Sequence, residues 1–508
     1  MIPLQSMTAR LAGIFVACLL LLPMPQARGA DNAADRRIVH VLNRLAFGPT
    51  VDDFRHVKAI GVERYIAEQL APSAIAEPFE LRWRLAQFDT LNLDAVQLRR
   101  LYGPLPSVAG AKPSPEAVTE QRQRARIIVE QAAAARLFRA LLSRRQLQEV
   151  MVDFWFNHFN VFDEKGLDRV WIGNYEQQAI RPYALGHFRD LLFAVAKHPA
   201  MLVYLDNTQN TSPGSSGAHR SENGLNENFA REVMELHTLG VDGGYTQADV
   251  TTLARVFTGW SVNRPNARDF PEDAALFVGA RHDYGPKVFL GQQLRASGRA
   301  EGEEALGMLA TSPATAHHIA FELAQYFVAD TPPPVLVDQL AARFIDTGGD
   351  IRAVLATLFA SAEFWDSAGQ KYKTPYEFVI SAARAAGVPV GNPRPLLGWM
   401  AQLGMPLYGC QTPDGYKNTE DAWLSPDAML RRISFATAFA RGALPLGDPN
   451  GGAPGDAAPP PPSVPVDAAR LEEIFGSILT ERTRAAVAQA PPGLRAALIL
   501  GSPGFMRR

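Results

Sequence analysis

The sequence predicts a mainly α fold, a multi-helix globular body with a small β-hairpin and a C-terminal helical unit after a proline-rich linker. Apolar residues recur at helical spacing through most of the chain, whereas strand-like alternation is confined mainly to 274–291. A chain of 508 residues, 47% hydrophobic and 20% charged, can also bury a large core. The composition is therefore that of an ordinary globular protein.

The helical spacing divides the chain into segments. We expect helices at 33–47, 51–70, 80–102, 117–162, 167–197, 226–239, 247–258, 300–329, 334–346, 350–364, 374–386, 394–403, 425–442 and 467–489. In "AALFVGARHDYGPKVFLG", residues 274–291, two apolar runs flank the turn-forming "HDYGP" and predict a hairpin. These elements assign a main helical domain to 30–442.

Two stretches interrupt the helical pattern. Residues 206–225 are rich in Gly, Ser and Asn and directly precede the expected helix at 226–239, which predicts a mobile loop. Residues 443–466 contain eight prolines and predict an extended linker. A C-terminal helical segment at 467–508 follows this linker.

The first 29 residues have the layout of a signal peptide. Arg10 precedes an apolar run at 11–22, and small residues follow the run. We expect cleavage near Gly29 or Ala30 and export to the periplasm or the exterior. The apolar run is too short for a comfortable membrane span, so no span is expected in the mature chain.

The charge of the chain bears on its partners, and its cysteine content bears on its stability. The formal net charge is −2, and loss of the two leader arginines makes it more negative, so no nucleic-acid partner is implied. Without the leader, Cys410 is the only cysteine, and the mature protein must be stable without an internal disulfide. Cys18 follows "FVA", which leaves a lipoprotein cleavage as the alternative form of export.

The segment "NENFAREVMELHTLG", which opens at residue 226, concentrates charged side chains on one short helix. Its apolar stripe consists of Phe229, Val233 and Leu236. Glu232 and His237 flank this stripe on opposite sides. A carboxylate at the edge of a core needs a partner, so Glu232 is a candidate general acid or base. Arg231 is spaced to form exposed i,i+4 ion pairs with Glu227 and Glu235.

The segment "QEVMVDFWFNHFNVF", residues 148–162, is apolar around nearly the whole helical wheel, which predicts a central buried helix. Asn157 and His158 lie on the same side as its apolar residues. Buried polar groups are hydrogen-bonded, so this pair indicates a polar pocket or a buried water.

Further candidates follow in 246–260 and in the expected hairpin. Thr246 and Asp249 have capping-box spacing, which favours a cap over a catalytic role for Asp249. Arg255 lies off the core stripe of the next helix. Trp260 at the end of that helix is either a stacking platform or a packing residue.

The turn of the expected hairpin is bracketed by His282, Asp283 and Lys287. Such a tip could direct an acid, an imidazole and an ammonium group toward one point, which suits proton transfer and oxyanion stabilisation. It could equally be a solvated turn in which Asp283 caps its own backbone.

The commonest catalytic signatures are absent. The sequence has no GxSxG, GxxxxGK, GxGxxG or HExxH pattern and no cysteine pair in the mature chain. These absences remove the usual esterase, nucleotide-binding and zinc-protease interpretations. The cofactor stays unknown, with a divalent metal as one option.

Several segments together resemble one bacterial family. They are "LNRLAFGPT", "FWFNHFNV", "NENFAREVMELHTLGVDGGYTQADV", "ARVFTGW", "HDYGPKVFLG", "KTPYEFVISAARAAG" and "SPGFMRR". In this order they are similar to the family catalogued as domain of unknown function 1800. The resemblance implies an exported, mainly helical protein, often encoded beside a member of a sulfatase-related family, and it implies no settled activity. The chain departs from the family pattern at Tyr416, where tryptophan is common, and in its proline-rich insertion.

The residues favour an extracytoplasmic hydrolase or lyase that acts on a polyhydroxylated, saccharide-like substrate. Glu232 would act as general acid or base, Asp283 as second carboxylate, His158 or His282 as proton relay, and Arg255 would orient a carboxylate. The remaining candidate substrate contacts are Asn157, Trp260 and Lys287.

Two alternatives stay open. The protein could be a noncatalytic partner or stabiliser of the neighbouring sulfatase-like protein. It could also be a metal-dependent enzyme, with Glu232, Glu235 and one or more of His158, His237 and His282 as ligands.

Overall fold

Short capping sequences decide where many helices of this chain begin. Four of the described helices start with a capping box, in which the N-cap side chain accepts a hydrogen bond from the N3 amide and the N3 side chain accepts one from the N-cap amide; the N-caps are Thr50, Asp94, Thr246 and Thr374. The Thr246 and Asp249 box is the one expected from the sequence, and Asp249 therefore caps a helix.

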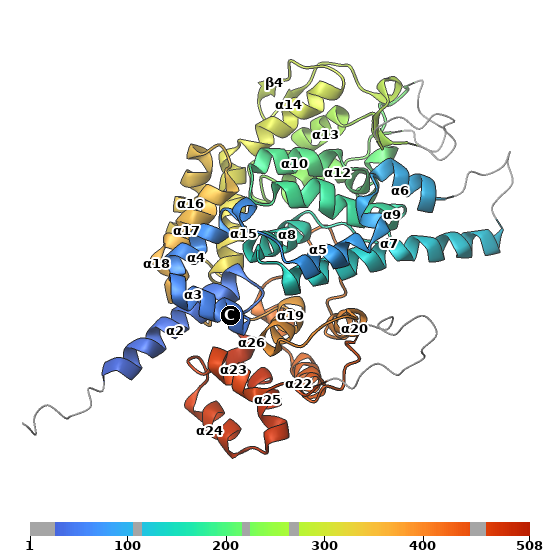
Figure 1. Ribbon diagram of the computed structural model, residues 1–508. Helices are drawn as coiled ribbons and strands as arrows, with labels where there is room; N and C mark the ends of the chain where they lie inside the picture. The colour runs from blue at the N-terminus through green and yellow to red at the C-terminus, as the bar shows by residue number, and fades with distance from the viewer. Residues whose placement is uncertain (1–25, 105–113, 216–223, 264–273, 448–463) are drawn as a thin grey trace, which may run out of the picture.

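The computed structural model describes residues 26–104, 114–215, 224–263, 274–447 and 464–508, and the side chains from residue 32 onward (Figure 1). The N-terminal elements are α2 (Gln26–Leu45), α3 (Val51–Ile60), α4 (Val62–Gln69), η1 (Pro72–Ala74), α5 (Phe79–Ala86), η2 (Asp89–Asn92) and α6 (Ala95–Tyr102). Residues 1–25 of the expected signal peptide lie outside the described residues.

The middle of the chain supplies the helices at the centre of the body. They are α7 (Pro115–Leu142), α8 (Gln146–His158), α9 (Asp168–Tyr175), η3 (Glu176–Ile180), η4 (Arg181–Tyr183), α10 (Phe188–Lys197), α11 (Pro199–Tyr204) and η5 (Asn207–Gln209). As the sequence predicts, α8 is buried on nearly all sides, and Figure 1 shows it at the centre of the molecule.

One end of the body holds both small sheets of the described residues. Its elements are α12 (Asn228–Glu235), α13 (Gln247–Val256), β1 (Trp260–Val262), β2 (Ala275–Phe277), η6 (Gly279–Arg281), β3 (Val288–Phe289), β4 (Gln292–Gln293) and α14 (Arg299–Ala310). Next to it pack α15 (Pro313–Phe327), α16 (Pro334–Asp346), α17 (Ile351–Ala360) and α18 (Ala362–Asp366).

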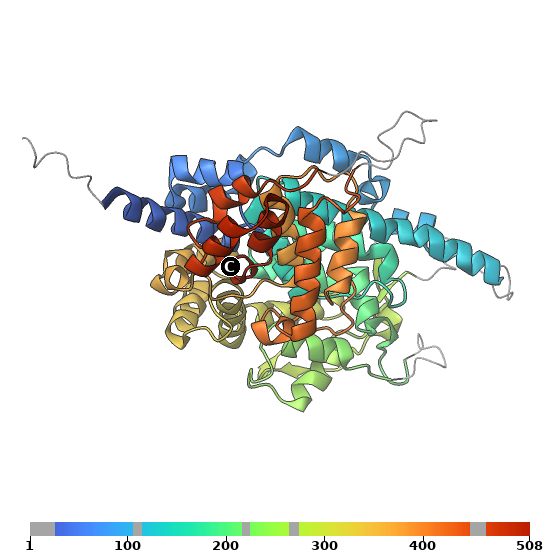
Figure 2. The same ribbon diagram turned by 90° about the horizontal axis from the view of Figure 1, so that it is seen from below.

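The C-terminal part completes the fold with α19 (Pro375–Ala386), α20 (Arg394–Gln402), α21 (Glu420–Trp423), α22 (Pro426–Ala440), α23 (Ala468–Phe475), α24 (Glu481–Gln489), α25 (Pro492–Leu500) and α26 (Pro503–Met506). Here α23 contacts α3 and α19, and α25 contacts α22. Figure 2 shows this group lying across one face of the body.

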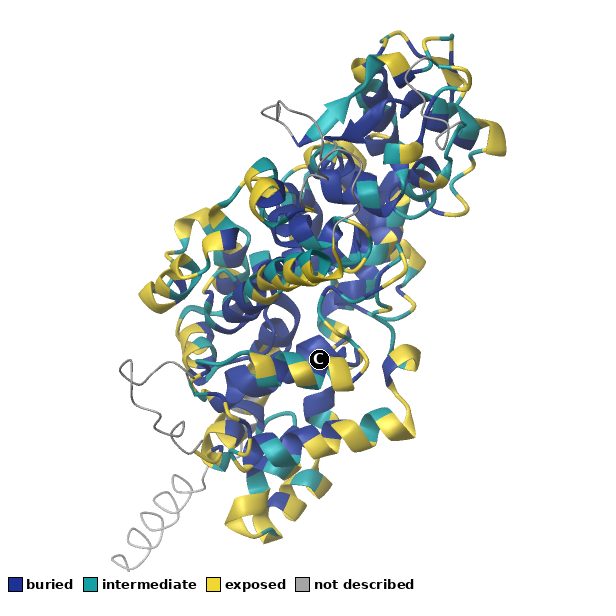
Figure 3. Cartoon of the chain, turned by 90° about the vertical axis from the view of Figure 1, so that its right-hand side faces the viewer, coloured by how far each residue is buried: buried dark blue, intermediate teal, exposed yellow. Residues whose placement is uncertain are grey.

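The mainly α fold is confirmed, and the buried apolar side chains form one contiguous cluster from Ile38 to Met506. Figure 3 shows the buried residues along the inside of the helices and the exposed residues on their outer faces. The 467–508 segment shares this core, because Leu471, Ile474 and Phe505 belong to the cluster. Its apolar burial therefore stabilises the whole body.

The hairpin expected at 274–291 is wrong in its pairing. The segment contains β2 and β3, but β2 pairs with β1 (Leu276 with Ser261) and β3 pairs with β4 (Val288 with Gln293). The β3–β4 turn places Leu290 and Gly291 at φ 48° and 75°, the conformation that closes a two-residue hairpin. Residues between β2 and β3 are instead drawn into a buried ion cluster.

Several expected long helices are shorter in the structure. The 51–70 helix breaks at Gly61 (φ 87°), and the 300–329 helix breaks before Pro313, where Ser312 caps α15. The 117–162 helix breaks at Ser143, which leaves the helical conformation and whose hydroxyl donates to Glu77. Of these three breaks, the one before Pro313 is followed by a helix start with a side-chain cap, whereas α4 and α8 begin without one.

The two expected irregular stretches are partly described. In 206–225, the buried amides of Asn207 and Asn210 donate to backbone carbonyls of the α13–β1 region, so this part of the stretch is anchored. Residues 216–223 lie outside the described residues, as do 448–463 of the expected linker. Beside the latter, Leu446 accepts hydrogen bonds from the amides of Gly391 and Asn392.

Across the described part of the chain, no helix has both the length and the apolarity that crossing a bilayer requires.

Candidate functional site

A cavity of about 450 Å³, with both polar and apolar side chains in its lining, opens where α8, α12 and α15 meet the segment 405–419. We call it the His158 cavity. Both Asn157 and His158, the adjacent polar residues at the end of α8, line it, as the sequence suggested for a polar pocket. Its volume lies within the usual range for small-molecule sites.

His158 is held in the cavity wall by hydrogen bonds at both ring nitrogens. Nδ1 lies 2.6 Å from Oε2 of Glu322 on α15, and Nε2 lies 3.3 Å from the carbonyl oxygen of His237. Burial alone would raise the pKa of Glu322, but the charge and hydrogen bond of His158, together with His318 and Lys417, lower it. An ionised Glu322 therefore requires the proton of this bond to lie on His158.

Asn157 fastens the 405–419 segment to the end of α8. Its amide nitrogen donates to the Tyr416 carbonyl and its amide oxygen accepts from the Tyr416 amide, both at 2.8 Å. A side chain at Gly415 (φ 67°) would lie 2.3 Å from the Asn157 carbonyl oxygen, so only glycine fits here. Because both ends of the amide are used, Asn157 is a positioning residue.

The fastened segment brings a carboxylate and an ammonium group to the cavity. Asp414 and Lys417 both line it and form an ion pair of 2.7 Å. Burial acts against the shift, yet hydrogen bonds from Lys417 and Thr412 keep the pKa of Asp414 below its ordinary value. Asn418 also lines the cavity, and its buried Oδ1 has no hydrogen-bond partner among the described residues.

Glu232 is not one of the residues that line the cavity; it lies on α12, one helical turn before Leu236, which does line it. It is half-buried, and no hydrogen bond or ion pair joins its carboxyl group to another described residue. Burial and the charges of Glu235 and Asp414 raise its pKa, against the opposing charge of Arg231. Neighbouring carboxyl groups with opposite pKa shifts are typical of acid–base pairs.

The charged face of α12 behaves as its spacing predicts. Arg231 pairs with Glu227 at 3.3 Å and with Glu235 at 3.1 Å, and all three side chains are partly exposed. This confirms the solvated i,i+4 ion pairs and separates Glu235 from Glu232, since only Glu235 has a partner.

The other sequence candidates gather in a second place, which we call the Lys287 cluster. Arg255 pairs with Asp283 at 2.7 Å, and the fully buried ammonium of Lys287 lies 2.8 Å from Glu301. His282 Nε2 lies 3.2 Å from the same carboxylate, and its Nδ1 donates to the Thr258 carbonyl at 2.8 Å. Lys287 also donates to the carbonyls of Asp283 and Gly285.

The Lys287 cluster explains the lost hairpin. Asp283 accepts from the Gly285 amide at 2.8 Å, the backbone-capping alternative considered for this turn. The turn itself is exposed at Tyr284 and Pro286, whereas the flanking His282 and Lys287 are buried. Burial opposes the shift, while the hydrogen bond from Arg255 keeps the pKa of Asp283 low. Trp260 is buried against Gly302, which favours packing over a stacking role.

The residues suggested as metal ligands do not form a ligand set. Glu235 pairs with Arg231, His282 belongs to the Lys287 cluster, and burial together with the charges of His158 and His318 holds the pKa of His237 well below its ordinary value. Within the described ranges, no three His, Cys, Asp or Glu side chains gather so as to hold a metal ion. The carboxylate and histidine metal site is therefore not supported by this arrangement.

Sequence reasoning missed Glu322, His318, Asp414 and Lys417. Glu322 and His318 are four residues apart on α15, so their shared face was readable from the sequence. The pairing of Glu322 with His158, 164 positions away, was not, because no local signal predicts it.

Residues 40–507, nearly the whole chain, match the family model described as "Protein of unknown function (DUF1800)". The chain belongs to this family. No curated protein and no solved structure matches it. In this DUF1800 protein the matched span contains every residue of the His158 cavity and of the Lys287 cluster.

Proposed function

We propose that this protein is an extracytoplasmic hydrolase or lyase that acts on a saccharide-like, polyhydroxylated substrate in the His158 cavity. The observation that carries the proposal is the hydrogen-bonded His158–Glu322 pair in the wall of a cavity large enough for a small molecule. A buried imidazole held by a carboxylate has a fixed orientation and keeps that carboxylate ionised.

The lining supports a hydroxyl-rich substrate. Amide and hydroxyl groups line the cavity from three segments: Gln325, Thr374, Asn418 and Thr419. Such groups both donate and accept hydrogen bonds, as sugar hydroxyls require.

In this proposal Glu232 is the general acid, because its raised pKa keeps it protonated closer to neutral pH. Asp414 replaces Asp283 as the second carboxylate, since Asp414 lines the His158 cavity and Asp283 belongs to the Lys287 cluster. Asp414 would accept a proton from water in a hydrolase, or from the substrate carbon in a lyase. The relay role expected for His158 is not kept, because one ring nitrogen bonds Glu322 and the other bonds the His237 carbonyl; His158 would instead hold Glu322 ionised in the cavity wall.

The test compares Glu232→Gln with Glu235→Gln on one helix. The mature protein is screened for reducing-end release and for unsaturated products on neutral and acidic polysaccharides. We expect Glu232→Gln to lower the rate by about 10²–10⁴-fold, the usual contribution of a general acid. Glu235→Gln should be nearly silent, because its exposed ion pair contributes only about 0–1 kcal/mol.

The pH profile adds a second readout. Activity should fall as the pH rises through the raised pKa of Glu232 and fall as it drops through the lowered pKa of Asp414. Absence of product from every polysaccharide, or equal rates for both variants, would contradict the proposal.

Export is part of the proposal and rests on the sequence of residues 1–29. N-terminal sequencing of the secreted form should find a start near Gly29 or Ala30. An intact Met1 or a lipid on Cys18 would contradict this form of export.

A second candidate function is that of a partner for the neighbouring sulfatase-like protein. It is favoured by exposed apolar side chains on α22, where Leu430 and Ile433 lie about one turn apart. Co-purification of the two proteins, lost in a Leu430→Ser and Ile433→Ser variant, would support it. Unchanged co-purification of that variant would contradict the assignment of the surface.

A further inference from the structure

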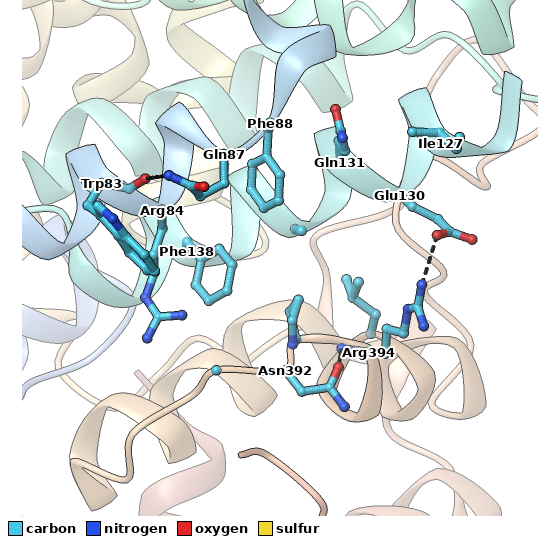
Figure 4. Close-up of a pocket in the computed structure, with 14 residues that line it drawn as sticks. Trp83, Arg84, Gln87, Phe88, Ile127, Glu130, Gln131, Phe138, Asn392 and Arg394 are labelled. Atoms are coloured by element: carbon cyan, nitrogen blue, oxygen red, sulfur yellow. Dashed lines mark hydrogen bonds and ion pairs between the residues drawn. The ribbon is translucent and has the colours of Figure 1, made fainter. Parts of the chain in front are cut away.

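A second and larger cavity, of about 750 Å³, lies between α5 and α7 on one side and residues 391–397 on the other. We call it the Trp83 cavity. Figure 4 shows Trp83, Phe88 and Phe138 on one wall facing Asn392 across the gap. Its walls therefore come from parts of the chain more than 250 positions apart, which only the fold brings together.

The Trp83 cavity is separate from the His158 cavity because α7 lies between them. Ala134 and Phe138 line the Trp83 cavity, whereas Arg136, between them in sequence, pairs at 2.5 Å with Asp153, which lines the His158 cavity. Two positions along a helix correspond to about 200° around its axis, so these side chains point in opposite directions. A ligand here would not contact the proposed catalytic groups.

The wall formed by α5 and α7 is aromatic and partly exposed. Phe88 and Phe138 are nearly parallel, at 17°, with ring centroids 6.2 Å apart. The side chain of Trp83 is 51% exposed and that of Ile127 is 44% exposed, although both line the same cavity. Exposed apolar surface in a concave site is covered favourably by a flat apolar ligand.

Cationic groups approach this apolar floor from both walls. The Arg84 guanidinium lies 4.8 Å from the centre of the Phe138 ring. Its Nε and one terminal nitrogen bond Glu80, so the other terminal nitrogen has no partner among the described residues. Arg394 stands on the opposite wall beside Glu130, at 3.0 Å, as Figure 4 shows.

Each of the two guanidinium groups has a carboxylate partner, Glu80 for Arg84 and Glu130 for Arg394, but Arg84 keeps one terminal nitrogen that no described residue bonds, beside an aromatic floor. Arginine binds carboxylate and sulfonate groups through charge-assisted hydrogen bonds. We propose that the Trp83 cavity is a binding site for an amphipathic organic acid, a flat aromatic or alicyclic body with one anionic group. The apolar body covers Trp83 and Phe88, and the anionic group meets Arg84.

The test uses 8-anilinonaphthalene-1-sulfonate as an acidic probe and N-phenyl-1-naphthylamine as its uncharged counterpart. The mature protein is titrated with each dye by fluorescence and by calorimetry. We expect saturable binding of the acidic dye at one site per chain, with weaker binding of the neutral dye. No saturable binding of the acidic dye to the folded protein would overturn the proposal.

Two matched pairs of variants on α5 locate the site. Trp83→Ala should weaken binding of both dyes by about tenfold, as truncation of a buried aromatic anchor does. Phe79→Ala should leave binding unchanged, because Phe79 is 74% exposed and lies outside the cavity lining. Equal affinities in these two variants would overturn the location.

Arg84→Met should weaken the acidic dye by about tenfold, a loss typical of a hydrogen bond to a charged group, and leave the neutral dye unchanged. Arg82→Met is the control, because Arg82 is exposed on the same helix and does not line the cavity. Equal weakening of both dyes by Arg84→Met would overturn the assignment of an acidic ligand. Thermal melting of each variant confirms that the binding is measured on folded protein.

Discussion

Removal of the Lys287 ammonium is the sharpest test of whether the Lys287 cluster is structural. In Lys287→Met the apolar stem is kept, but Glu301 loses the cation that lies 2.8 Å from one carboxylate oxygen and 3.1 Å from the other. The Lys287 side chain is fully buried and Glu301 is nearly so, so water cannot replace the ammonium. Breaking a buried ion pair in this way costs about 3–5 kcal/mol.

The unfolding entropy of about 2.1 cal/mol/K per residue converts this loss into a fall in Tm of roughly 3–5 °C for a chain of this length. Urea unfolding and thermal melting measure it. A double variant, Lys287→Met with Glu301→Met, should recover most of the loss, because removing both charges leaves none unpaired. If Lys287→Met kept the wild-type Tm but abolished turnover, the cluster would be catalytic and the structural reasoning refuted.

Three further outcomes follow from buried polar groups. Asn160→Ala should lower the free energy of unfolding by about 1–3 kcal/mol in urea, because the amide donates to the Cys410 carbonyl and to a second loop carbonyl. Burial lowers the pKa of Lys373 to about 7, whereas its ordinary pKa is 10.5. Between these two pH values the unfolded chain keeps a proton on Lys373 that the folded chain has lost, so the free energy of unfolding should rise with pH. Lys373→Met should flatten this rise. The pKa of Glu322 is lower in the folded protein than its ordinary value of 4.5, so the ionised carboxylate stabilises the fold above pH 4.5. This stabilisation is lost as the pH falls through the lowered pKa of the folded state. Glu322→Gln should therefore reduce the fall in Tm at acid pH.

Much of the fold was readable because helical periodicity is local. The expected helix at 334–346 coincides with α16, and the expected start at Thr246 coincides with a capping box. Misjudged boundaries lie where the backbone leaves the helical conformation inside a continuous apolar pattern, as at Ser143 and Ser312. The pairing of β1 with β2 could not be read, because both alternatives satisfy the same short apolar runs.

The sequence predicted some residues of the candidate site but not their distant partners. Asn157 and His158 stood out as polar residues on an apolar helix, and both line the cavity. Their partners, Glu322 and the backbone of Tyr416, lie 164 and 259 positions away, and a single sequence carries no signal of such contacts. Asp283 and Lys287 were candidates because a turn can present charged side chains to a substrate. In the structure Lys287 is buried and forms ion pairs with Asp283 and Glu301.

Glu232 and Glu235 lie three residues apart on helix α12 but in different surroundings. Arg231 lies between Glu227 and Glu235 at i,i+4 spacing and neutralises both at the surface, so neither carboxylate is available for a ligand. Glu232 is rotated by about 60° from Glu235 around the helix axis, so it lies outside the row of ion pairs and closer to the apolar stripe of the helix. There it is half-buried with no partner among the described residues, and its pKa rises while that of Asp414 falls. An unpaired carboxyl group beside a cavity is unfavourable for stability alone, so Glu232→Gln should leave the Tm unchanged or raise it while turnover is lost. A lower Tm with unchanged turnover would make Glu232 a structural anchor.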